Sequence, residues 1–257
     1  MDLHLSGKVV IVTGGAKGIG EAIVRLLAEE GAVPVIIDKD VEAGNKLGLS
    51  LPSRNLILSA NLNSPESCAQ MVEQVTQHFG RIDGLVNNAG INDNVGLEKG
   101  SPSTFRTSLI NNAEHYYSMA HFCLPLLKAS KGSIVNISSK TALTGQGNTS
   151  GYAGAKGAIL AFTREWAVEL LPYQIRVNAI LPAEVWTPMY ANWIQSFPKP
   201  EEKLDSIHAR IPLEHRMTTP QEIANMAVYL LSDRSSHMTG QWLHVDGGYV
   251  HLDRAIG

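Results

Sequence analysis

A glycine-rich segment near the start of the chain constrains the fold more than any other feature. The segment Thr13–Gly20 follows the β-branched run Lys8–Val12 and leads into a helical stretch in which Ile19, Ile23 and Leu27 lie on one face. Glycines between a strand and a helix permit a tight turn, and the free N–H groups of the helix N-terminus face phosphate groups. Its spacing, Gly-x3-Gly-x-Gly, lacks the G-K-[ST] ending of a P-loop. The segment therefore predicts a Rossmann-type dinucleotide-binding turn.

The same alternation of apolar runs and helical stretches continues along all 257 residues. Strands are expected at 8–12, 33–37, 55–60, 82–86, 133–137, 175–181 and 242–245. Helices are expected after the glycine segment and at about 41–49, 64–79, 103–129, 151–171 and 219–232. Because alternating strands and helices imply right-handed crossovers, the pattern predicts one α/β domain over residues 1–257. Its core is a doubly wound, mostly parallel sheet of about seven strands with helices on both faces.

One segment, 183–218, departs from this alternation. It contains Pro188, Pro198, Pro200 and Pro212. We interpret it as a helical insertion that acts as a substrate lid, and a plain surface excursion is the alternative.

Composition narrows the class of protein. The formal net charge is −3, whereas nucleic-acid binders usually carry a basic face, so no nucleic-acid partner is expected. Cys68 and Cys123 have no metal-ligand or disulfide spacing, and we expect no metal site. No run approaches 18 apolar residues and the first residues do not resemble a signal peptide, so we expect a cytoplasmic protein without a membrane partner.

Asp38 is the candidate that selects the dinucleotide. It ends the second expected strand, 24 residues after Gly14. A carboxylate there accepts hydrogen bonds from the adenosine ribose hydroxyls and repels the 2′-phosphate of NADP. Lys17 and Lys39 act in the opposite direction because they attract a phosphate. We favour NAD, with NADP as the alternative.

A Ser–Tyr–Lys set supplies the candidate chemistry. Ser139 follows the fifth expected strand, and Tyr152 and Lys156 are spaced i, i+4 near the start of a helix, so they share a face. An ammonium near the phenol is expected to lower its pKa, and a fall of about 3 units corresponds to about 4 kcal/mol. The tyrosine then takes the proton of a substrate hydroxyl while Ser139 orients the reacting oxygen.

Together these features resemble the short-chain dehydrogenase/reductase family over essentially the whole chain. The matching motifs are Thr13–Gly20, Asn87–Gly90, Asn112, Ser139, Tyr152 with Lys156, Arg176–Ala179, Thr187–Pro188 and Asp246–Gly248. The resemblance implies a nicotinamide-dependent oxidoreductase. Two departures are Asn61-Leu62, where the family usually has Asp-Val, and Pro182-Ala183, where it usually has Pro-Gly.

The resemblance also implies residue roles. Asn112 would hold a water that links Lys156 to solvent; it is preferred to Asn111 because the family places this Asn thirteen residues before a proline, here Pro125. Lys156 would also bind the nicotinamide ribose. The implied cofactor-binding residues are Gly14, Lys17, Gly18, Ile19, Gly20, Asp38, Asn61, Leu62, Asn88, Gly90, Tyr152, Lys156, Val185 and Thr187.

The expected substrate side is polar. Besides Ser139 and Tyr152, the candidate substrate residues are Gln146, Asn148, Glu184 and Trp186. Amides and a carboxylate beside an aromatic side chain favour a ligand with many hydroxyls, because an apolar ligand would leave these polar groups without hydrogen-bond partners. The segments 138–156, 182–188 and 251–255 resemble bacterial L-fucose dehydrogenases. This implies oxidation of L-fucose, or of L-galactose or D-arabinose, at the anomeric carbon to the 1,5-lactone.

Two other functions are alternatives. A carbonyl reductase of 3-oxoacyl thioesters or steroids would need an apolar pocket, which Glu184 and Gln146 disfavour. A non-catalytic dinucleotide sensor commonly loses the Tyr or the Lys, and both are present here. The family resemblance also implies a homotetramer in which the helices at 103–129 and 151–171 form an interface.

Overall fold

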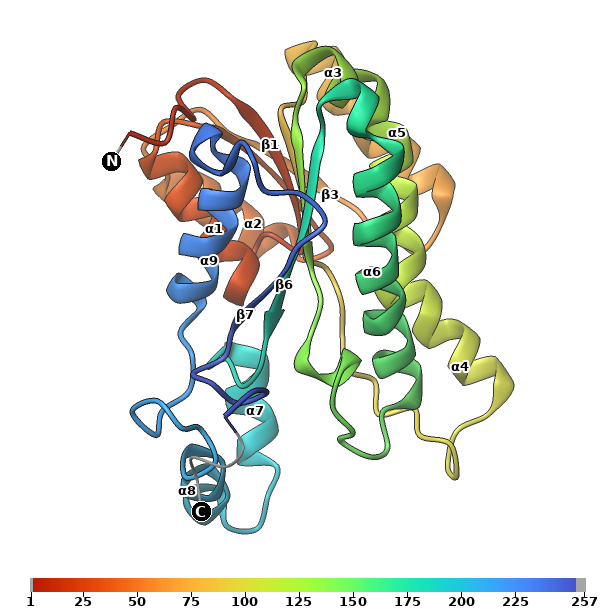
Figure 1. Cartoon of the computed structure of the whole chain (residues 1–257), viewed down its shortest axis with the longest axis vertical. Helices are drawn as coiled ribbons and strands as arrows, with labels where there is room; N and C mark the ends of the chain where they lie inside the picture. Colours follow the sequence, from red (N-terminus) through yellow and green to blue (C-terminus); the bar gives the residue numbers. More distant parts are fainter. Residues whose placement is uncertain (1, 253–257) are drawn as a thin grey trace.

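A parallel sheet of seven strands organises residues 2–252, the part of the chain that the computed structural model describes (Figure 1). The strands are β1 (Val9–Thr13), β2 (Val33–Asp38), β3 (Leu56–Ser59), β4 (Gly84–Asn87), β5 (Ser133–Ile137), β6 (Arg176–Pro182) and β7 (Trp242–Val245). Their order is β3-β2-β1-β4-β5-β6-β7, and every pairing is parallel. The Rossmann-type fold predicted from the sequence is confirmed. The strand order reverses between β1 and β4, where such sheets bind ligands beyond the carboxyl ends of the strands.

Helices cover both faces of the sheet (Figure 1). One face carries α1 (Gly18–Glu29), α2 (Val41–Ser50) and α9 (Pro220–Leu231), whose apolar residues form one core cluster with β1 and β2. The other face carries α3 (Pro65–Phe79), α5 (His115–Ser130) and α6 (Ser150–Glu169), which bury a second cluster. The strands contribute to both clusters because successive side chains alternate between the two faces.

The helix expected at 103–129 is present as a helical stretch over residues 102–130, but a π-helical turn that the sequence did not predict interrupts its α-helical geometry. A capping box between Ser101 and Thr104 starts α4 (Pro102–Leu109), a π-helical turn follows at Ile110–Glu114, and α5 begins at His115. A π turn inserts one extra residue into a helix and shifts the direction of the side chains that follow, often at functional sites. Here it sets the direction of Asn112, His115 and the residues after them.

The segment 183–218 forms two short helices below the carboxyl edge of the sheet, α7 (Pro188–Gln195) and α8 (Pro200–His208) (Figure 1). Each begins with a proline at its first position, where the missing N–H is harmless. They enclose a small apolar cluster of their own. The parallel bridge between Val185 and Thr218 joins the two ends of the insertion. The helical insertion is therefore present, and its role as a lid stays a prediction.

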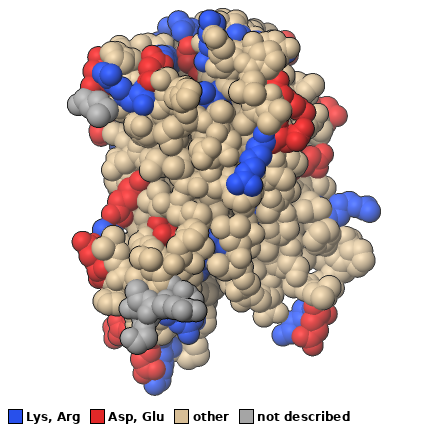
Figure 2. Space-filling view, viewed as in Figure 1, with Lys and Arg blue, Asp and Glu red and all other residues tan. Residues whose placement is uncertain are grey.

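Two surface properties complete the description of residues 2–252. In this range no helix combines the length and the apolar character needed to cross a membrane. Among the residues that Figure 2 colours, acidic and basic side chains are scattered and form no continuous basic area on the visible face. Asp253, Arg254 and Ala255, which belong to the tail that resembles L-fucose dehydrogenases, lie outside the described residues.

Candidate active site

The glycine turn has the geometry that a pyrophosphate requires. Gly14 has φ of 62° and Gly18 has φ of 58°, a left-handed conformation that disfavours other residues. A Cβ on Gly14 would lie 2.9 Å from the Cα of Ala89, and one on Gly20 would lie 2.0 Å from the carbonyl of Gly14. Helix α1 begins at Gly18 without a side-chain cap, which leaves the N–H groups of its first turn to face an anion. Gly14, Gly18, Ile19 and Gly20 thus fit a dinucleotide.

Asp38 lies at the carboxyl end of β2, beside this turn. Its carboxylate accepts hydrogen bonds from the backbone N–H groups of Ala16 and Asp40, both at 3.0 Å, and remains half-buried. Lys17 does not extend into this site freely, because its Nζ lies 2.5 Å from a carboxylate oxygen of Asp40. The Asp40 carboxylate raises the pKa of Lys17, which stays protonated. The pair as a whole carries no net charge, so it offers a phosphate less attraction than Lys17 alone was expected to offer. Lys39 is exposed.

The other expected cofactor residues lie on loops at the same edge. The Asn88 amide donates to the carbonyls of Thr13 (2.9 Å) and Gly14 (3.0 Å), which fixes the glycine turn against β4. Thr187 caps α7, and its Cγ2 would lie 3.3 Å from a Cβ on Gly18. The structure thereby brings the start of the insertion to the glycine turn. Val185 is buried beside it, whereas Asn61 and Leu62 follow β3, exposed and buried respectively.

Ser139, Tyr152 and Lys156 converge where β5 ends and α6 begins. Ser139 caps a short 3-10 turn, and its Oγ accepts a hydrogen bond from the Thr141 backbone N–H at 3.2 Å. Tyr152 lies in the first turn of α6 and Lys156 one turn later, with its Nζ 5.6 Å from the centre of the Tyr152 ring. Ser139 also forms a hydrogen bond with the Tyr152 hydroxyl that favours the ionised phenol.

The acid–base properties of this set differ from the sequence prediction. Burial raises the pKa of Tyr152 to about 12, only partly offset by the hydrogen bond with Ser139. Burial lowers the pKa of Lys156 to about 7. The expected lowering of the Tyr152 pKa by Lys156 is therefore absent from this structure. The physical reason is that the ammonium turns away from Tyr152 and donates to the Tyr116 hydroxyl (3.0 Å) and the Ile137 carbonyl (2.9 Å).

Asn112 lies close to Lys156, as the predicted relay requires. Its Oδ1 accepts from the Ile91 backbone N–H at 2.7 Å and its Nδ2 donates to the Ser108 carbonyl at 3.0 Å. A Cβ on Gly90 would lie 3.0 Å from that Oδ1 and 3.4 Å from the Lys156 Nζ. Gly90 therefore packs against both the Asn112 side chain and the Lys156 ammonium, where a larger residue would crowd them. The Asn112 side chain orients the surrounding backbone, and its role in a proton relay stays a prediction.

A buried polar cluster adjoins the catalytic serine, and sequence reasoning found only one of its members. Lys140, the residue after Ser139, forms an ion pair with Glu184, although its side chain is only 9% exposed. The Tyr190 hydroxyl donates to the other oxygen of Glu184 at 2.7 Å, and the Lys140 ammonium lies 4.1 Å from the centre of the Tyr249 ring. We call Lys140, Glu184 and Tyr190 the polar cluster. A charged residue inside an otherwise uncharged segment was the available signal for Lys140.

The remaining predicted substrate residues are more exposed. Gln146 and Asn148 lie on an exposed loop, and the Asn148 backbone packs against Gly96. Trp186 is 44% exposed, with its ring centre 6.4 Å from that of Tyr190. The structure thus brings Glu184 and Trp186 to the insertion near Ser139, but gives Gln146 and Asn148 no side-chain contact with the catalytic set.

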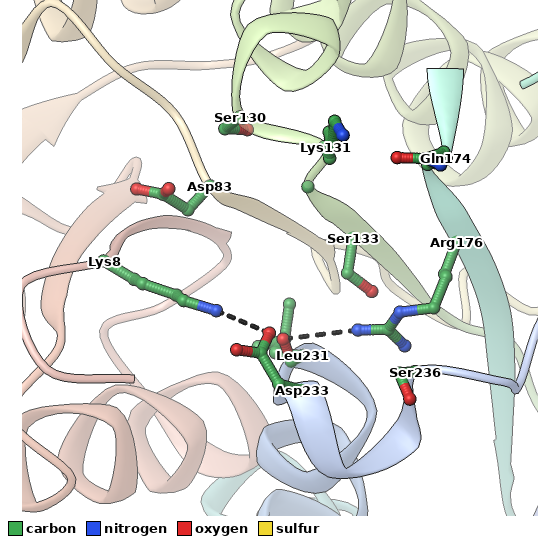
Figure 3. Close-up of a pocket in the computed structure, with 11 residues that line it drawn as sticks. Lys8, Asp83, Ser130, Lys131, Ser133, Gln174, Arg176, Leu231, Asp233 and Ser236 are labelled. Atoms are coloured by element: carbon green, nitrogen blue, oxygen red, sulfur yellow. Dashed lines mark hydrogen bonds and ion pairs between the residues drawn. The ribbon is translucent and has the colours of Figure 1, made fainter. Parts of the chain in front are cut away.

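A cavity of about 350 Å³ lies elsewhere, at the amino edge of the sheet (Figure 3). Lys8, Asp83 and Arg176 line it, and Lys8 pairs with Asp233 at 2.8 Å. The Arg176 guanidinium donates to the carbonyls at the end of α9. These contacts tie strands to a helix end and lie at the edge opposite to Ser139. Within residues 2–252, no cluster of three or more acidic, His or Cys side chains is arranged to hold a metal.

Comparison with known families agrees with this geometry. A family model described as Enoyl-(Acyl carrier protein) reductase matches residues 14–250, from the glycine turn to the end of the described chain. The chain belongs to the short-chain dehydrogenase/reductase family. The family resemblance stated from the sequence motifs is confirmed.

Relatives of this short-chain dehydrogenase/reductase include enzymes with different substrates. It is 37% identical to L-fucose dehydrogenase of Bos taurus over 249 residues, covering 96% of this chain and 91% of the relative. It is 34% identical to the 3-oxoacyl-[acyl-carrier-protein] reductase FabG of Thermotoga maritima, covering 96% and 100%. The crystal structure of Cj0485 dehydrogenase superposes with a TM-score of 0.95 at 50% identity, covering 99% of this chain and 98% of that one.

Membership of the short-chain dehydrogenase/reductase family makes the chain an oxidoreductase of NAD(H) or NADP(H). The open turn at Gly14–Gly20, the first N–H groups of α1 and the carboxylate of Asp38 are the residues that would hold the dinucleotide. Thr187 lies beside the glycine turn, and the contacts with the cofactor that the resemblance implies for Lys156 and Thr187 stay a prediction.

Proposed function

We propose that this oxidoreductase oxidises the anomeric hydroxyl of an aldose, with L-fucose as the first candidate and L-galactose and D-arabinose as the next. The product is the sugar 1,5-lactone. Similarity to L-fucose dehydrogenases of several mammals, at 35 to 37% identity, supports this substrate class.

The proposed reaction assigns one task to each side chain. A dinucleotide held by its pyrophosphate at the glycine turn would supply the nicotinamide that accepts the hydride from C1. Tyr152 takes the proton from O1 as the C1–O1 bond becomes a carbonyl. Ser139 holds O1, and its hydrogen bond to Tyr152 favours the phenolate that accepts this proton. Lys156 supplies the positive charge that a phenolate needs in a buried site.

The polar cluster is the observation that carries the substrate assignment. Lys140 and Glu184 are largely buried, and Lys140 directly follows Ser139, the residue proposed to hold the reacting oxygen. Their remaining hydrogen-bonding capacity needs polar partners when a substrate excludes water. A polyhydroxylated ring supplies such partners, whereas an acyl chain or a steroid would leave the groups unpaired at a cost in binding.

We propose NAD rather than NADP as the cofactor. A carboxylate at the end of β2, beside the glycine turn, would repel the 2′-phosphate of NADP, which supports NAD. Lys17, the nearest cation of the glycine turn, is paired with Asp40 and offers that phosphate little net charge.

One alternative is reduction of a 3-oxoacyl thioester, and a specific observation favours it. Trp186, Met189 and Trp193 of the insertion are 44%, 58% and 40% exposed, and such side chains can line an apolar entrance. The similarity to the FabG protein of Thermotoga maritima points the same way.

Initial rates of NADH and NADPH formation test both assignments. The panel is L-fucose, L-galactose, D-arabinose, D-glucose and a hydrophobic secondary alcohol, with acetoacetyl thioester reduction measured separately. We expect the highest kcat/KM for L-fucose with NAD. Tyr152→Phe should lower kcat by about 10³-fold while NADH still binds, and Tyr229→Phe on α9 is the control. Turnover of only the hydrophobic alcohol or the thioester would exclude the sugar assignment.

We further propose a homotetramer. Tyr117 of α5 and Val168 of α6 are 55% and 65% exposed, on the helices expected to form an interface. Light scattering of the purified chain should give four times the monomer mass, and a monomer would refute this assembly.

A further inference from the structure

Tyr116 is a second buried tyrosine at the catalytic lysine. It lies in the first turn of α5, directly after the π turn, and its ring is fully buried. Its hydroxyl donates to the Ile137 carbonyl at 2.9 Å. Because its single proton is used there, the oxygen accepts the hydrogen bond from the Lys156 Nζ at 3.0 Å.

Within residues 2–252, the Tyr116 hydroxyl forms hydrogen bonds with the Ile137 carbonyl and with Lys156, and the bond to Ile137 does not use its acceptor side. A phenylalanine would fill the same apolar space beside Met119 and Ile159, but would leave the Lys156 ammonium with one acceptor fewer. Burial raises the pKa of Tyr116 well above its usual value near 10, so the group remains a neutral phenol and does not compete with Tyr152 as a base.

The hydrogen bond from Lys156 to the Tyr116 hydroxyl affects how one proton is distributed between Tyr152 and Lys156. After the pair has lost one proton, two arrangements compete: a phenolate with an ammonium, or a phenol with a neutral amine. Only the first contains the base that oxidation needs. Burial favours the second, since it raises the pKa of Tyr152 to about 12 and lowers that of Lys156 to about 7.

We propose that Tyr116 is a positioning residue that keeps Lys156 in its ammonium form and so favours the phenolate–ammonium arrangement of the catalytic pair. Its acceptor oxygen stabilises a charge that its apolar surroundings would otherwise expel. This inference rests on the proposed oxidation by Tyr152, and it adds a residue that acts only through Lys156.

The other groups around Lys156 do not take over this task. His115, from α5, is buried, and burial together with the Lys156 charge lowers its pKa to about 4, so it is neutral in the working range. Its Nε2 donates to the Asn111 carbonyl at 3.1 Å, and its Nδ1 has no partner within residues 2–252. Asn112 uses its side-chain oxygen on Ile91. Among the described titratable groups, only Tyr116 has a side-chain acceptor in hydrogen-bond contact with Lys156.

Tyr116→Phe tests the proposal through the pH profile of oxidation with NAD. We expect the plateau of kcat to fall about tenfold, the scale of one hydrogen bond to a charged group. The rising acid limb should also move to lower pH, by up to about one unit, because Lys156 gives up its proton more readily and the limb reports the coupled pair. Tyr229→Phe on α9, whose hydroxyl donates to the Arg234 carbonyl away from the catalytic set, should leave both quantities unchanged.

A binding measurement separates this inference from the proposed reaction. The dissociation constant of NADH, followed by fluorescence from pH 6 to 9, should begin to rise at a lower pH in Tyr116→Phe than in the parent, because a neutral Lys156 holds the ribose less well. A parent enzyme that oxidises none of the tested substrates would refute the proposed function and leave this titration to decide on Tyr116. If Tyr116→Phe shifts neither the acid limb of the kcat profile nor the pH at which the NADH dissociation constant begins to rise, the positioning role is wrong, even if the rate falls.

Discussion

The glycine turn at Thr13–Gly20 and the insertion at 183–218 border the same catalytic residues, but different interactions hold them. Backbone contacts shape the turn, because Gly14 and Gly20 allow chain segments to approach more closely than any side chain permits. The insertion has a small apolar cluster of its own, one bridge from Val185 to Thr218, and the pair between Lys140 and Glu184. The first region accepts few residue types, whereas the second depends on a few replaceable side chains.

This difference separates cofactor recognition from substrate recognition. A dinucleotide presents the same pyrophosphate in every case, so a turn made of backbone N–H groups suffices. Substrates vary, and their selection falls to side chains on an attached segment while the catalytic scaffold stays unchanged. Substitutions in the polar cluster should therefore affect sugar use, and substitutions near Asp38 should affect dinucleotide use.

Among the substitutions that compare these two regions, the largest effect is expected from Lys140→Met. The change leaves the Glu184 carboxylate largely buried, with the Tyr190 hydroxyl as its remaining side-chain partner. We expect the free energy of unfolding to fall by about 3 kcal/mol. We expect kcat/KM for the sugar to fall by about 10- to 100-fold, with little change in the dissociation constant of NADH. Urea denaturation, initial rates and fluorescence titration measure the three quantities.

A matched control for Lys140→Met lies on the insertion that also carries Glu184. Lys199 also pairs with a glutamate, Glu202 at 2.6 Å, but both side chains are 70% exposed. Lys199→Met should change neither stability nor turnover measurably, because exposed pairs contribute little. If Lys140→Met weakened NADH binding as strongly as sugar use, the two regions would not be separable.

Asp38→Asn is expected to have a smaller effect, and on dinucleotide use instead of sugar use. The amide loses the charge that repels a 2′-phosphate, and its single oxygen satisfies only one of the two N–H groups that Asp38 now accepts. KM for NAD should rise about tenfold. The ratio of kcat/KM for NAD to that for NADP should fall by roughly 10- to 100-fold. Relative rates among sugars should stay as they are.

Asp205→Asn provides the same change in net charge on exposed α8 and should leave the cofactor ratio untouched. A parent enzyme that already prefers NADP would show that Asp38 does not act as proposed.

The difference between a turn shaped by its backbone and an insertion held by side-chain contacts also explains which features could be predicted from the sequence. The sheet and the glycine turn follow from apolar periodicity and from residues at fixed spacing along the chain, so they were predicted correctly. Tyr152 and Lys156 share a helix, and their proximity follows from the spacing alone.

Contacts between distant segments were not predictable in this way. Lys140 and Glu184 are 44 positions apart and meet only because β5 and β6 are neighbours. Tyr116 reaches Lys156 because a π turn interrupts a helix whose sequence pattern looks continuous. Gln146 and Asn148 were selected for their polarity, yet their loop is exposed. Side-chain polarity indicates a preference for partners but not which partners the fold provides.

The smallest predicted effect, from Asp40→Asn, sharpens the comparison within the cofactor region. Asparagine caps a helix about as well as aspartate, so the bond to the Ala43 N–H and the start of α2 should persist, with stability unchanged. The substitution releases Lys17, whose ammonium can then approach a 2′-phosphate. We expect kcat/KM for NADP to rise about two- to fivefold while that for NAD is unchanged, the modest scale on which exposed charges act. The double variant Lys17→Met/Asp40→Asn should abolish this gain, and a gain that persisted there would mean that Lys17 is not its source.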